Sequence, residues 1–246
     1  LAVGILQQVR GGVLFLDASL PCPGDGCQRM GLPRTKSIVD LLPLLDRLTP
    51  QFLSTYLLSA PSGVPCLSLV SDVMQASAMT QPVLEQVFRI LDETFDYLIV
   101  DLGVTTGEAG AFLLDRIDQM CVVADPSPLG LARAGHMLGL LRAVQFPAGS
   151  TSIVVNRTSE ECSGAGASQL ELPVLAYLPD QPATVAWATQ KSRPLIELRA
   201  EDELSAAFAD LARSFIQRAF RQRTDAKAAV GASADTPVTT RRDVKL

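Results

Sequence analysis

The sequence predicts an α/β fold in which a doubly wound, mostly parallel sheet is covered by helices on both sides. Short apolar runs, typical of strands that are buried on both faces, recur along the chain. Amphipathic helical segments alternate with these runs, which is the order expected of a parallel sheet. The 246 residues are 48 % apolar and 19 % charged, so they can bury the core of one α/β domain.

Strands are predicted where a short apolar run is bounded by residues that favour turns. These runs lie at 13–17, 64–70, 97–101, 119–124, 152–156 and 174–178. The run VLFLD closes on Asp17 and the run YLIVD closes on Asp101.

Helices are predicted where apolar residues recur every three or four positions. They lie at 1–9, 37–48, 50–58, 79–95, 127–144, 184–191 and 203–221. Gly11 and Gly12 would end the first helix, and Pro43 would kink or divide the second. The stretch 21–33 is rich in proline and glycine and is predicted to be a loop.

The composition changes close to residue 222. Residues 1–222 form one predicted domain, whereas 223–246 lack an apolar period and are predicted to be a disordered tail. From Arg218 to Leu246 there are seven basic and three acidic residues, against 14 and 23 in the preceding part. This acidic body disfavours a nucleic-acid-binding surface over most of the molecule.

The sequence has no membrane-spanning apolar run and no secretory signal. Its five cysteines are scattered, unlike a disulfide framework, so a reducing cytoplasm is the simplest compartment. Cys22 and Cys27 share a loop, but a metal site would need a second pair of ligands. His136 is the only histidine, which leaves almost no material for a Ser-His-Asp triad.

The two strand-terminal aspartates are the first candidates for a functional site. Ligands of open parallel sheets bind at the carboxyl ends of the strands, where Asp17 and Asp101 are both expected. A carboxylate at that edge can hold Mg²⁺ beside a nucleotide phosphate. A single such aspartate could equally cap a helix or start a turn, but two in one sheet indicate a site.

Four segments resemble, in the same order, those of the MinD/ParA group of deviant P-loop ATPases. VLFLDAS at 13–19 resembles the strand that leads into the group's Asp-x-Asp motif, and FDYLIVDLG at 95–103 resembles its Walker B strand. SIVVNR at 152–157 resembles the strand whose Asn-Arg pair borders the adenine, and 172–198 resembles the closing segment. The resemblance covers most of 1–220 and implies the P-loop NTPase fold, ATP and Mg²⁺ as ligands, and a homodimer.

Within this group the sequence is most similar to the TadZ/CpaE branch, which assembles and localises Flp/Tad (type IVc) pili. The similarity lies in SIVDLLPLLDRL, TPQFLSTYLLSAPSGVPCLSL and TQPVLEQVFRILDETFDYLIVDLG, in that order. It implies a cytoplasmic assembly or localisation protein that works with pilus-assembly or other inner-membrane machinery. The segment FIQRAFRQR at 215–223 has the composition of a membrane-surface helix, so peripheral membrane contact is an open alternative to a plain core helix.

The resemblance assigns roles to individual residues. Asp101 would support Mg²⁺ through water, and Asp17 would face the phosphates as the catalytic candidate. The adenine would be bordered by Asn156, Arg157, Pro179 and Asp180. Without the resemblance, these four would read as turn and surface residues.

The sequence departs from the family pattern at the phosphate loop. No Gly-x-x-x-x-Gly-Lys-Ser/Thr occurs, although that loop supplies the N–H groups and the lysine that bind phosphates. Leu1 is not methionine, so we expect either a fragment that lacks its first strand and phosphate loop or a non-AUG start codon. The resemblance places the absent strand mid-sheet, so we expect a gap or an imperfect pairing between the strands that end at Asp17 and Asp101.

The second departure concerns hydrolysis. The Asp-x-Asp motif reads Asp17-Ala18-Ser19, and Ser19 lacks the charge that polarises the attacking water in active members. Asp25 lies nearby and could substitute. Weak or absent hydrolysis is therefore expected. Two alternatives stay open: a partitioning or cell-division ATPase of the ParA/MinD kind, which the acidic body disfavours, and a catalytically dead interaction module.

Overall fold

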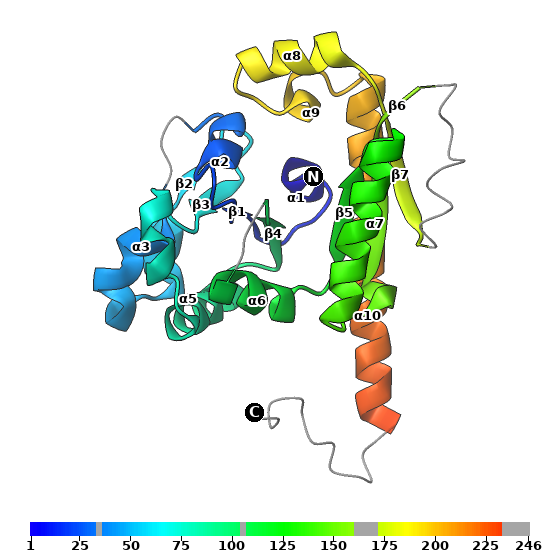
Figure 1. Cartoon of the computed structure of the whole chain (residues 1–246). Coiled ribbons are helices and arrows are strands. Elements are labelled where there is room, and N and C mark those ends of the chain that lie inside the picture. The colour runs from blue at the N-terminus through cyan, green and yellow to red at the C-terminus, as the bar shows by residue number, and fades with distance from the viewer. Residues whose placement is uncertain (33–35, 104–106, 160–171, 233–246) are drawn as a thin grey trace.

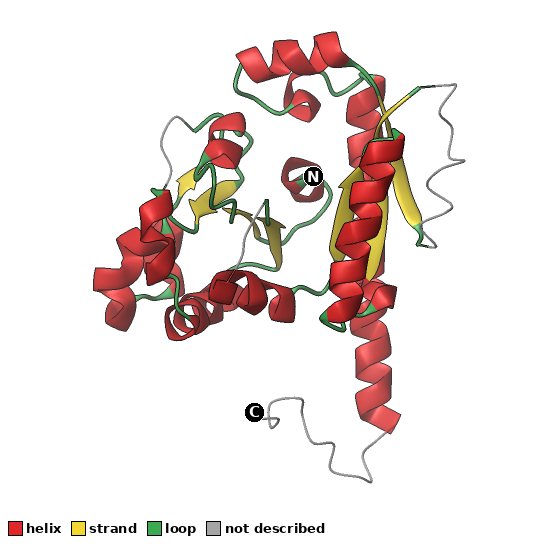
Figure 2. Cartoon of the chain, viewed as in Figure 1, coloured by secondary structure: helices red, strands yellow, loops and turns green. Residues whose placement is uncertain are grey.

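The computed structural model describes residues 1–32, 36–103, 107–159 and 172–232, with side chains as far as Arg221. Its strands fall into two sheets, one ordered β2-β3-β1-β4 and the other β5-β6-β7 (Figures 1 and 2). The strands are β1 (Val13–Asp17), β2 (Leu58–Ser59), β3 (Pro65–Ser68), β4 (Tyr97–Asp101), β5 (Met120–Ala124), β6 (Thr151–Thr158) and β7 (Val174–Pro179). Neighbouring strands are parallel except for the short edge strand β2, so the predicted mostly parallel sheet is confirmed.

Helices alternate with the strands, as the sequence predicted. The α-helices are α1 (Ala2–Leu6), α2 (Asp25–Arg29), α3 (Ile38–Leu41), α4 (Pro50–Tyr56), α5 (Gln81–Thr94), α6 (Gly107–Arg116), α7 (Pro128–Ala143), α8 (Pro182–Gln190), α9 (Leu195–Leu198) and α10 (Glu203–Ala232). Three 3₁₀ segments, η1 (Leu42–Arg47), η2 (Val73–Ala78) and η3 (Ala148–Ser150), complete the described elements. The expected division at Pro43 is confirmed, because α3 ends at Leu41 and a separate 3₁₀ segment, η1, follows with the proline as its second residue.

Both sheets carry helices on both faces. In β1, Leu14 and Leu16 point into a cluster with α3–α6, whereas Val13 and Phe15 point into a cluster with α1, α2 and α10. In the second sheet, residues of β5 and β6 pack on α7, and the opposite face packs on α8–α10. Side chains of a strand alternate between its faces, so the continuous apolar runs of the sequence serve two cores at once.

We expected a gap or an imperfect pairing between the strands that end at Asp17 and Asp101, and this expectation was wrong. Strands β1 and β4 are direct neighbours that pair in register over five residues, from Val13 opposite Tyr97 to Asp17 opposite Asp101. The break falls instead between β4 and β5, each of which ends the order of its sheet. The two apolar runs match in length and phase, so nothing prevents their parallel ladder from closing.

Three further elements differ from the sequence-based prediction. The short helix α2 lies inside the predicted loop 21–33, between Gly24 and Gly31, whose φ angles of 85° and 93° turn the chain. Helix α6 was not predicted. Helix α10 continues to Ala232, past the predicted helix end at residue 221 and into the predicted tail 223–246, because an alanine-rich sequence extends an existing helix without a new nucleus. The remainder of that predicted tail lies outside the described residues.

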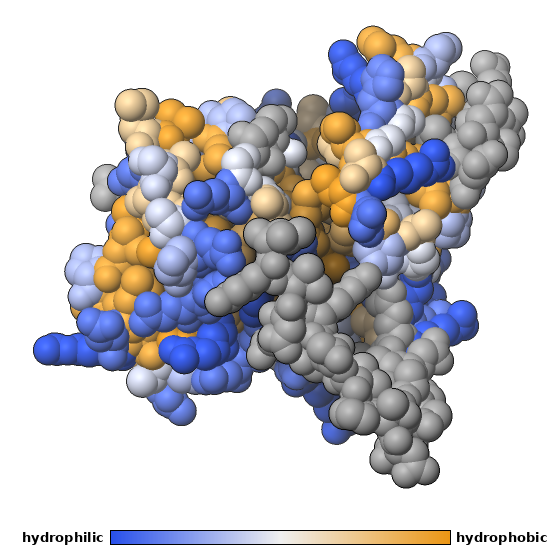
Figure 3. Space-filling model, turned by 60° about the horizontal axis from the view of Figure 1, so that its bottom comes forward, coloured by the Kyte–Doolittle hydropathy of each residue, from blue (hydrophilic) through white to orange (hydrophobic). Residues whose placement is uncertain are grey.

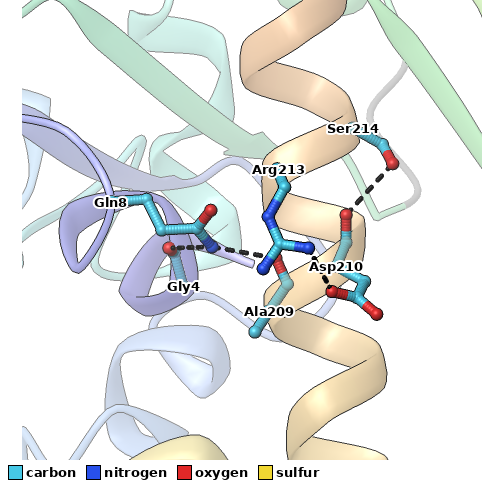
Figure 4. Close-up of polar contacts among 6 residues, drawn as sticks. All are labelled: Gly4, Gln8, Ala209, Asp210, Arg213 and Ser214. Carbon is cyan, nitrogen blue, oxygen red and sulfur yellow. Dashed lines mark hydrogen bonds and ion pairs between the residues drawn. The ribbon is translucent and has the colours of Figure 1, made fainter.

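Helices α1 and α10 join the two sheets, since Leu1 and Phe208 belong to apolar clusters on both of them. Figure 4 shows the polar part of this contact: Gln8 Nε2 donates to the carbonyl of Gly4 at 3.1 Å and to that of Ala209 at 2.8 Å. A Cβ atom at Gly4 would stand 3.1 Å from the Cβ of Ala212. The helices therefore approach as closely as they do because position 4 is glycine.

We expect Gly4→Leu to destabilise the protein by about 1–3 kcal/mol, because the added side chain must push α1 away from α10. Gly139 of α7 is the control, since a Cβ atom there meets nothing within 4 Å. Gly139→Leu should be neutral or stabilising by up to about 1 kcal/mol through helix propensity. Urea titrations of the two variants check this, and equal effects would contradict the account of the α1–α10 contact.

Candidate functional site

The carboxyl ends of the parallel strands hold the polar residues that the sequence singled out. Asp17 and Asp101 are register partners at the ends of β1 and β4, so the structure brings these two predicted residues together. The main chain continues this contact, because the N–H of Ala18 donates to the carbonyl of Asp101 at 2.9 Å. The first sheet thus presents two carboxyl groups side by side at its ligand-binding edge.

The two carboxyl groups have different environments. The side chain of Asp17 is buried, and its oxygens accept N–H bonds from Ser19 at 3.1 Å and Gly26 at 2.9 Å, with a further backbone bond from Cys27. Burial raises the pKa of Asp17 despite these bonds. Asp101 is exposed and, among the residues that the structure describes, accepts one hydrogen bond, from the N–H of Gly103 at 3.1 Å. Asp101 therefore has oxygen lone pairs to offer a ligand, whereas those of Asp17 are largely engaged.

We expect Asp17→Ala to lower the free energy of unfolding by about 1–3 kcal/mol, because it leaves buried N–H groups without an acceptor. Asp17→Asn keeps one acceptor oxygen and should cost less. Asp101→Ala should change stability by less than about 0.5 kcal/mol, since the carboxylate is exposed. Thermal or urea unfolding of the three variants measures this order. A value for Asp17→Ala at or above that of the wild type would show that the carboxyl group does not anchor the loop.

Ser19, which stands where the second aspartate of an Asp-x-Asp motif is expected, lies where the loops after β1 and β4 meet. A Cβ atom added at Gly103 would come within 2.5 Å of the hydroxyl oxygen of Ser19. Gly103 also has a φ angle of 47°, a backbone conformation that favours glycine. The hydroxyl of Ser19 is therefore held next to the turn that follows Asp101, at the same edge as the two carboxyl groups.

The adenine-bordering candidates lie at the corresponding edge of the second sheet. Asn156 and Arg157 lie towards the end of β6, and Asn156 pairs with Leu178 of β7, beside Pro179. The Asn156 side-chain oxygen accepts the N–H of Arg157 at 3.0 Å, and Arg157 has a φ angle of 60°. Asp180 donates its N–H to the carbonyl of Thr158 at 3.0 Å. The structure thus gathers these residues on one sheet and the two aspartates on the other.

Asp125 is a site residue that the sequence analysis missed. It directly follows β5 and accepts the N–H of Ser127 at 3.0 Å, over the first turn of α7, where Gly130 leaves room for the carboxylate. The bonds from Ser127, together with Arg157 and Arg133, lower its pKa. A signal was present: the run CVVA followed by Asp125 repeats the pattern of a strand closing on aspartate.

The open edges of β4 and β5 flank the space between the two sheets (Figure 1). Each strand has a hydrogen-bonded neighbour on one side only, among the residues that the structure describes. Val123 of β5 is 62 % exposed, which is unusual for an apolar residue in the middle of a parallel strand. Figure 3 shows apolar side chains in the hollow between the two parts of the molecule. An open edge next to exposed apolar residues is a surface onto which a further strand can pair.

Other candidates from the sequence gain no support. In the described part of the chain, no three His, Cys, Asp or Glu residues gather as metal ligands, which leaves the Cys22–Cys27 metal hypothesis without further ligands. No helix over the described ranges is long and apolar enough to cross a membrane.

Comparison with solved structures defines the fold. The chain is similar to a ParA family ATPase from Chlorobium tepidum TLS, with a TM-score of 0.76 and 22 % identity over 86 % of this chain and 89 % of that one. It is similar to the cell division ATPase MinD of Pyrococcus furiosus, with a TM-score of 0.68 and 18 % identity over 88 % and 90 %. It is also similar to MinD of Pyrococcus horikoshii, solved with Mg-ADP, with a TM-score of 0.67 and 18 % identity over 86 % of this chain and 85 % of that one.

These similarities establish the class of fold: a P-loop NTPase fold of the MinD/ParA type. The sequence itself matches no protein-family model and no curated protein. At these identities the structures show the fold alone.

Proposed function

We propose that this protein is a nucleotide-dependent switch of the MinD/ParA kind that binds ATP with Mg²⁺ at the carboxyl ends of its strands. One observation carries the proposal. In both sheets, polar side chains lie at the carboxyl ends of the parallel strands, and the open edges of β4 and β5 lie between the two sheets. The neighbour from Pyrococcus horikoshii was solved with Mg-ADP, which supports the choice of ligand.

The residues present could contact the Mg²⁺ ion and the adenine of such a nucleotide. Asp101 has an exposed carboxylate with free acceptor capacity, as a water-mediated Mg²⁺ contact requires. Asp125 at the neighbouring edge carries a further carboxylate, whose pKa the hydrogen bonds from Ser127 lower. Asp17 would hold the loop of Ser19 and Gly26 towards the phosphates. The adenine would be bordered by Asn156, Arg157, Pro179 and Asp180.

The phosphate-binding loop is not among these residues, since the 246-residue sequence has no Gly-x-x-x-x-Gly-Lys-Ser/Thr. We propose that this loop follows a further strand, encoded upstream, that pairs between β4 and β5. The two open edges and the exposed Val123 support that position. Inserted there, the strand would join the two sheets into one and cover the apolar surface between them.

The coding DNA upstream of Leu1 tests this proposal directly. An in-frame Gly-Lys-Ser/Thr within about ten codons would support it, because the loop must precede the first helix closely. An in-frame stop codon immediately upstream would overturn it.

For the cellular role we propose assembly or localisation of Flp/Tad pili in the manner of the TadZ/CpaE branch. Ser19 stands where an acidic residue is expected, which supports slow ATP hydrolysis. The excess of acidic residues before Arg218 supports a protein partner rather than DNA. Partitioning or cell-division positioning of the ParA/MinD kind is the alternative. The complete protein should bind as a homodimer to pilus-assembly machinery, with contact to the inner membrane or cell pole through the segment around the exposed Phe220.

Two measurements on the complete protein separate these roles. A pilus-assembly protein should leave double-stranded DNA unshifted in gels with ATP, and its deletion should abolish Flp/Tad pili. ATP-dependent DNA binding with normal piliation would instead establish the partitioning role.

A further inference from the structure

Two cysteines lie against each other beneath the candidate site. Cys27 belongs to α2 and Cys66 to β3, 39 residues apart in sequence, and both side chains are 0 % exposed. Their side chains share a hydrogen bond. The thiol of Cys66 also lies within hydrogen-bond reach of the carbonyl of Val64, at 3.5 Å. Cys27 and Cys66 also belong to the same buried cluster on the first sheet, so the two thiols are close neighbours in the fold.

The two cysteines lie next to Asp17, the buried carboxyl group at the end of β1 that holds the following loop. Cys66 pairs in register with Phe15 of β1, and a Cβ atom at Gly26 would stand 2.7 Å from the ring of Phe15, so α2 lies directly on this part of the sheet. The N–H groups of Gly26 and Cys27 are bonded to the carboxylate of Asp17. A link between Cys27 and Cys66 would therefore fix the helix whose amides hold Asp17.

We propose that Cys27 and Cys66 form a redox-sensitive dithiol, a modification site at which a small-molecule disulfide converts them into an intramolecular disulfide that clamps α2 to β3. One cysteine thiolate attacks the small disulfide, which releases one small thiol and leaves a mixed disulfide on the protein. The second cysteine then attacks the protein sulfur of that bond and releases the other small thiol. The two cysteines lose two electrons and two protons, and the small disulfide is reduced to two thiols.

The reaction needs a local opening, because both thiols are buried. The hydrogen bond with Cys27, which favours the protonated thiol of Cys66, and burial raise the pKa of Cys66, so little of it is thiolate in the closed structure. Helix α2 has five residues and lies between Gly24 and Gly31, both at positive φ, so the segment can open without disturbing the sheet. Cys27 is then the first thiol to react, and Cys66 resolves the mixed disulfide.

Peptide mapping of the 246-residue chain tests the proposal. The Cys22→Ser variant is treated with oxidised glutathione under native conditions, alkylated in denaturant and digested with trypsin. Peptide 11–29 then contains Cys27 alone and peptide 48–89 contains Cys66 alone, so their cross-link identifies the disulfide. We expect this cross-linked pair, its loss on reduction, and its absence when Cys27→Ser or Cys66→Ala is added. Cys121→Ser, in the other sheet, is the matched control and should leave it unchanged.

The clamp itself is tested by hydrogen exchange of the amides of 25–29 before and after oxidation. Slower exchange in the oxidised protein is expected, because α2 can no longer open from β3. The proposal is overturned if the cross-link forms only in denaturant, if Cys27 stops at the glutathione mixed disulfide, or if exchange is unchanged by oxidation.

Discussion

The 246-residue chain is expected to bind ATP about 10²- to 10⁶-fold more weakly than the same chain extended by its upstream strand and phosphate loop. Two or three charge-assisted hydrogen bonds to the phosphates, each worth about 1.5–3 kcal/mol, are missing from the shorter chain. Asn156 and Arg157, which we propose border the adenine, are present, so some base recognition is expected to remain. Calorimetry of both chains with ATP and Mg²⁺ measures the difference.

The Mg²⁺ dependence of binding distinguishes the roles of the two neighbouring carboxyl groups. In the extended protein, Asp101→Ala should weaken the dependence of ATP affinity on Mg²⁺ while leaving the fold intact, because Asp101 is exposed and, in the described part of the chain, hydrogen-bonded to Gly103 alone. Gln119→Ala, at the amino end of β5 and so at the opposite edge of the sheet, is a control that should leave the Mg²⁺ dependence unchanged. Tight, Mg²⁺-dependent binding of ATP by residues 1–246 alone would contradict our account of the phosphate site.

Ser19→Asp should raise single-turnover hydrolysis in the extended protein by about 10²-fold, with nucleotide affinity roughly unchanged. A carboxylate at this position can orient and polarise water, and a hydroxyl does so far less well. The structure places the position at the right edge, beside the turn that follows Asp101, but Gly103 crowds one side of it. The new side chain must therefore extend away from Gly103.

Rates at saturating ATP for the wild type, Ser19→Asp and Ser19→Asn complete this test. The asparagine variant matches aspartate in size without its charge, so a rise in both variants would mean that charge is not the cause. If the wild type already hydrolyses ATP as fast as Ser19→Asp, another group supplies the function. Asp25→Asn would then show whether that group is Asp25, at the start of α2. Fast turnover in the wild type would favour the ParA/MinD-type role over pilus assembly.

The sequence by itself determined the individual elements. Apolar runs placed β1, β4 and β5 almost to the residue, and the four-residue spacing from Val83 to Phe95 located α5. Both are local patterns, because side chains alternate along a strand and recur every 3.6 residues along a helix. The aspartates that close β1 and β4 could be predicted to lie at the same edge, because parallel strands end at one edge of a sheet. That the two strands are direct neighbours was not predicted, since a gap or an imperfect pairing was expected.

Only the tertiary structure decided which strands are neighbours and what each polar group touches. The ladder between β1 and β4 joins residues 84 positions apart, and no local period encodes that choice or the open edges of β4 and β5. Asp17 and Asp101 follow equally apolar runs, yet one is buried under the amides of α2 and the other is exposed. Burial and hydrogen bonding depend on what packs from elsewhere in the chain, so they separate a carboxyl group that anchors a loop from one that can bind a ligand.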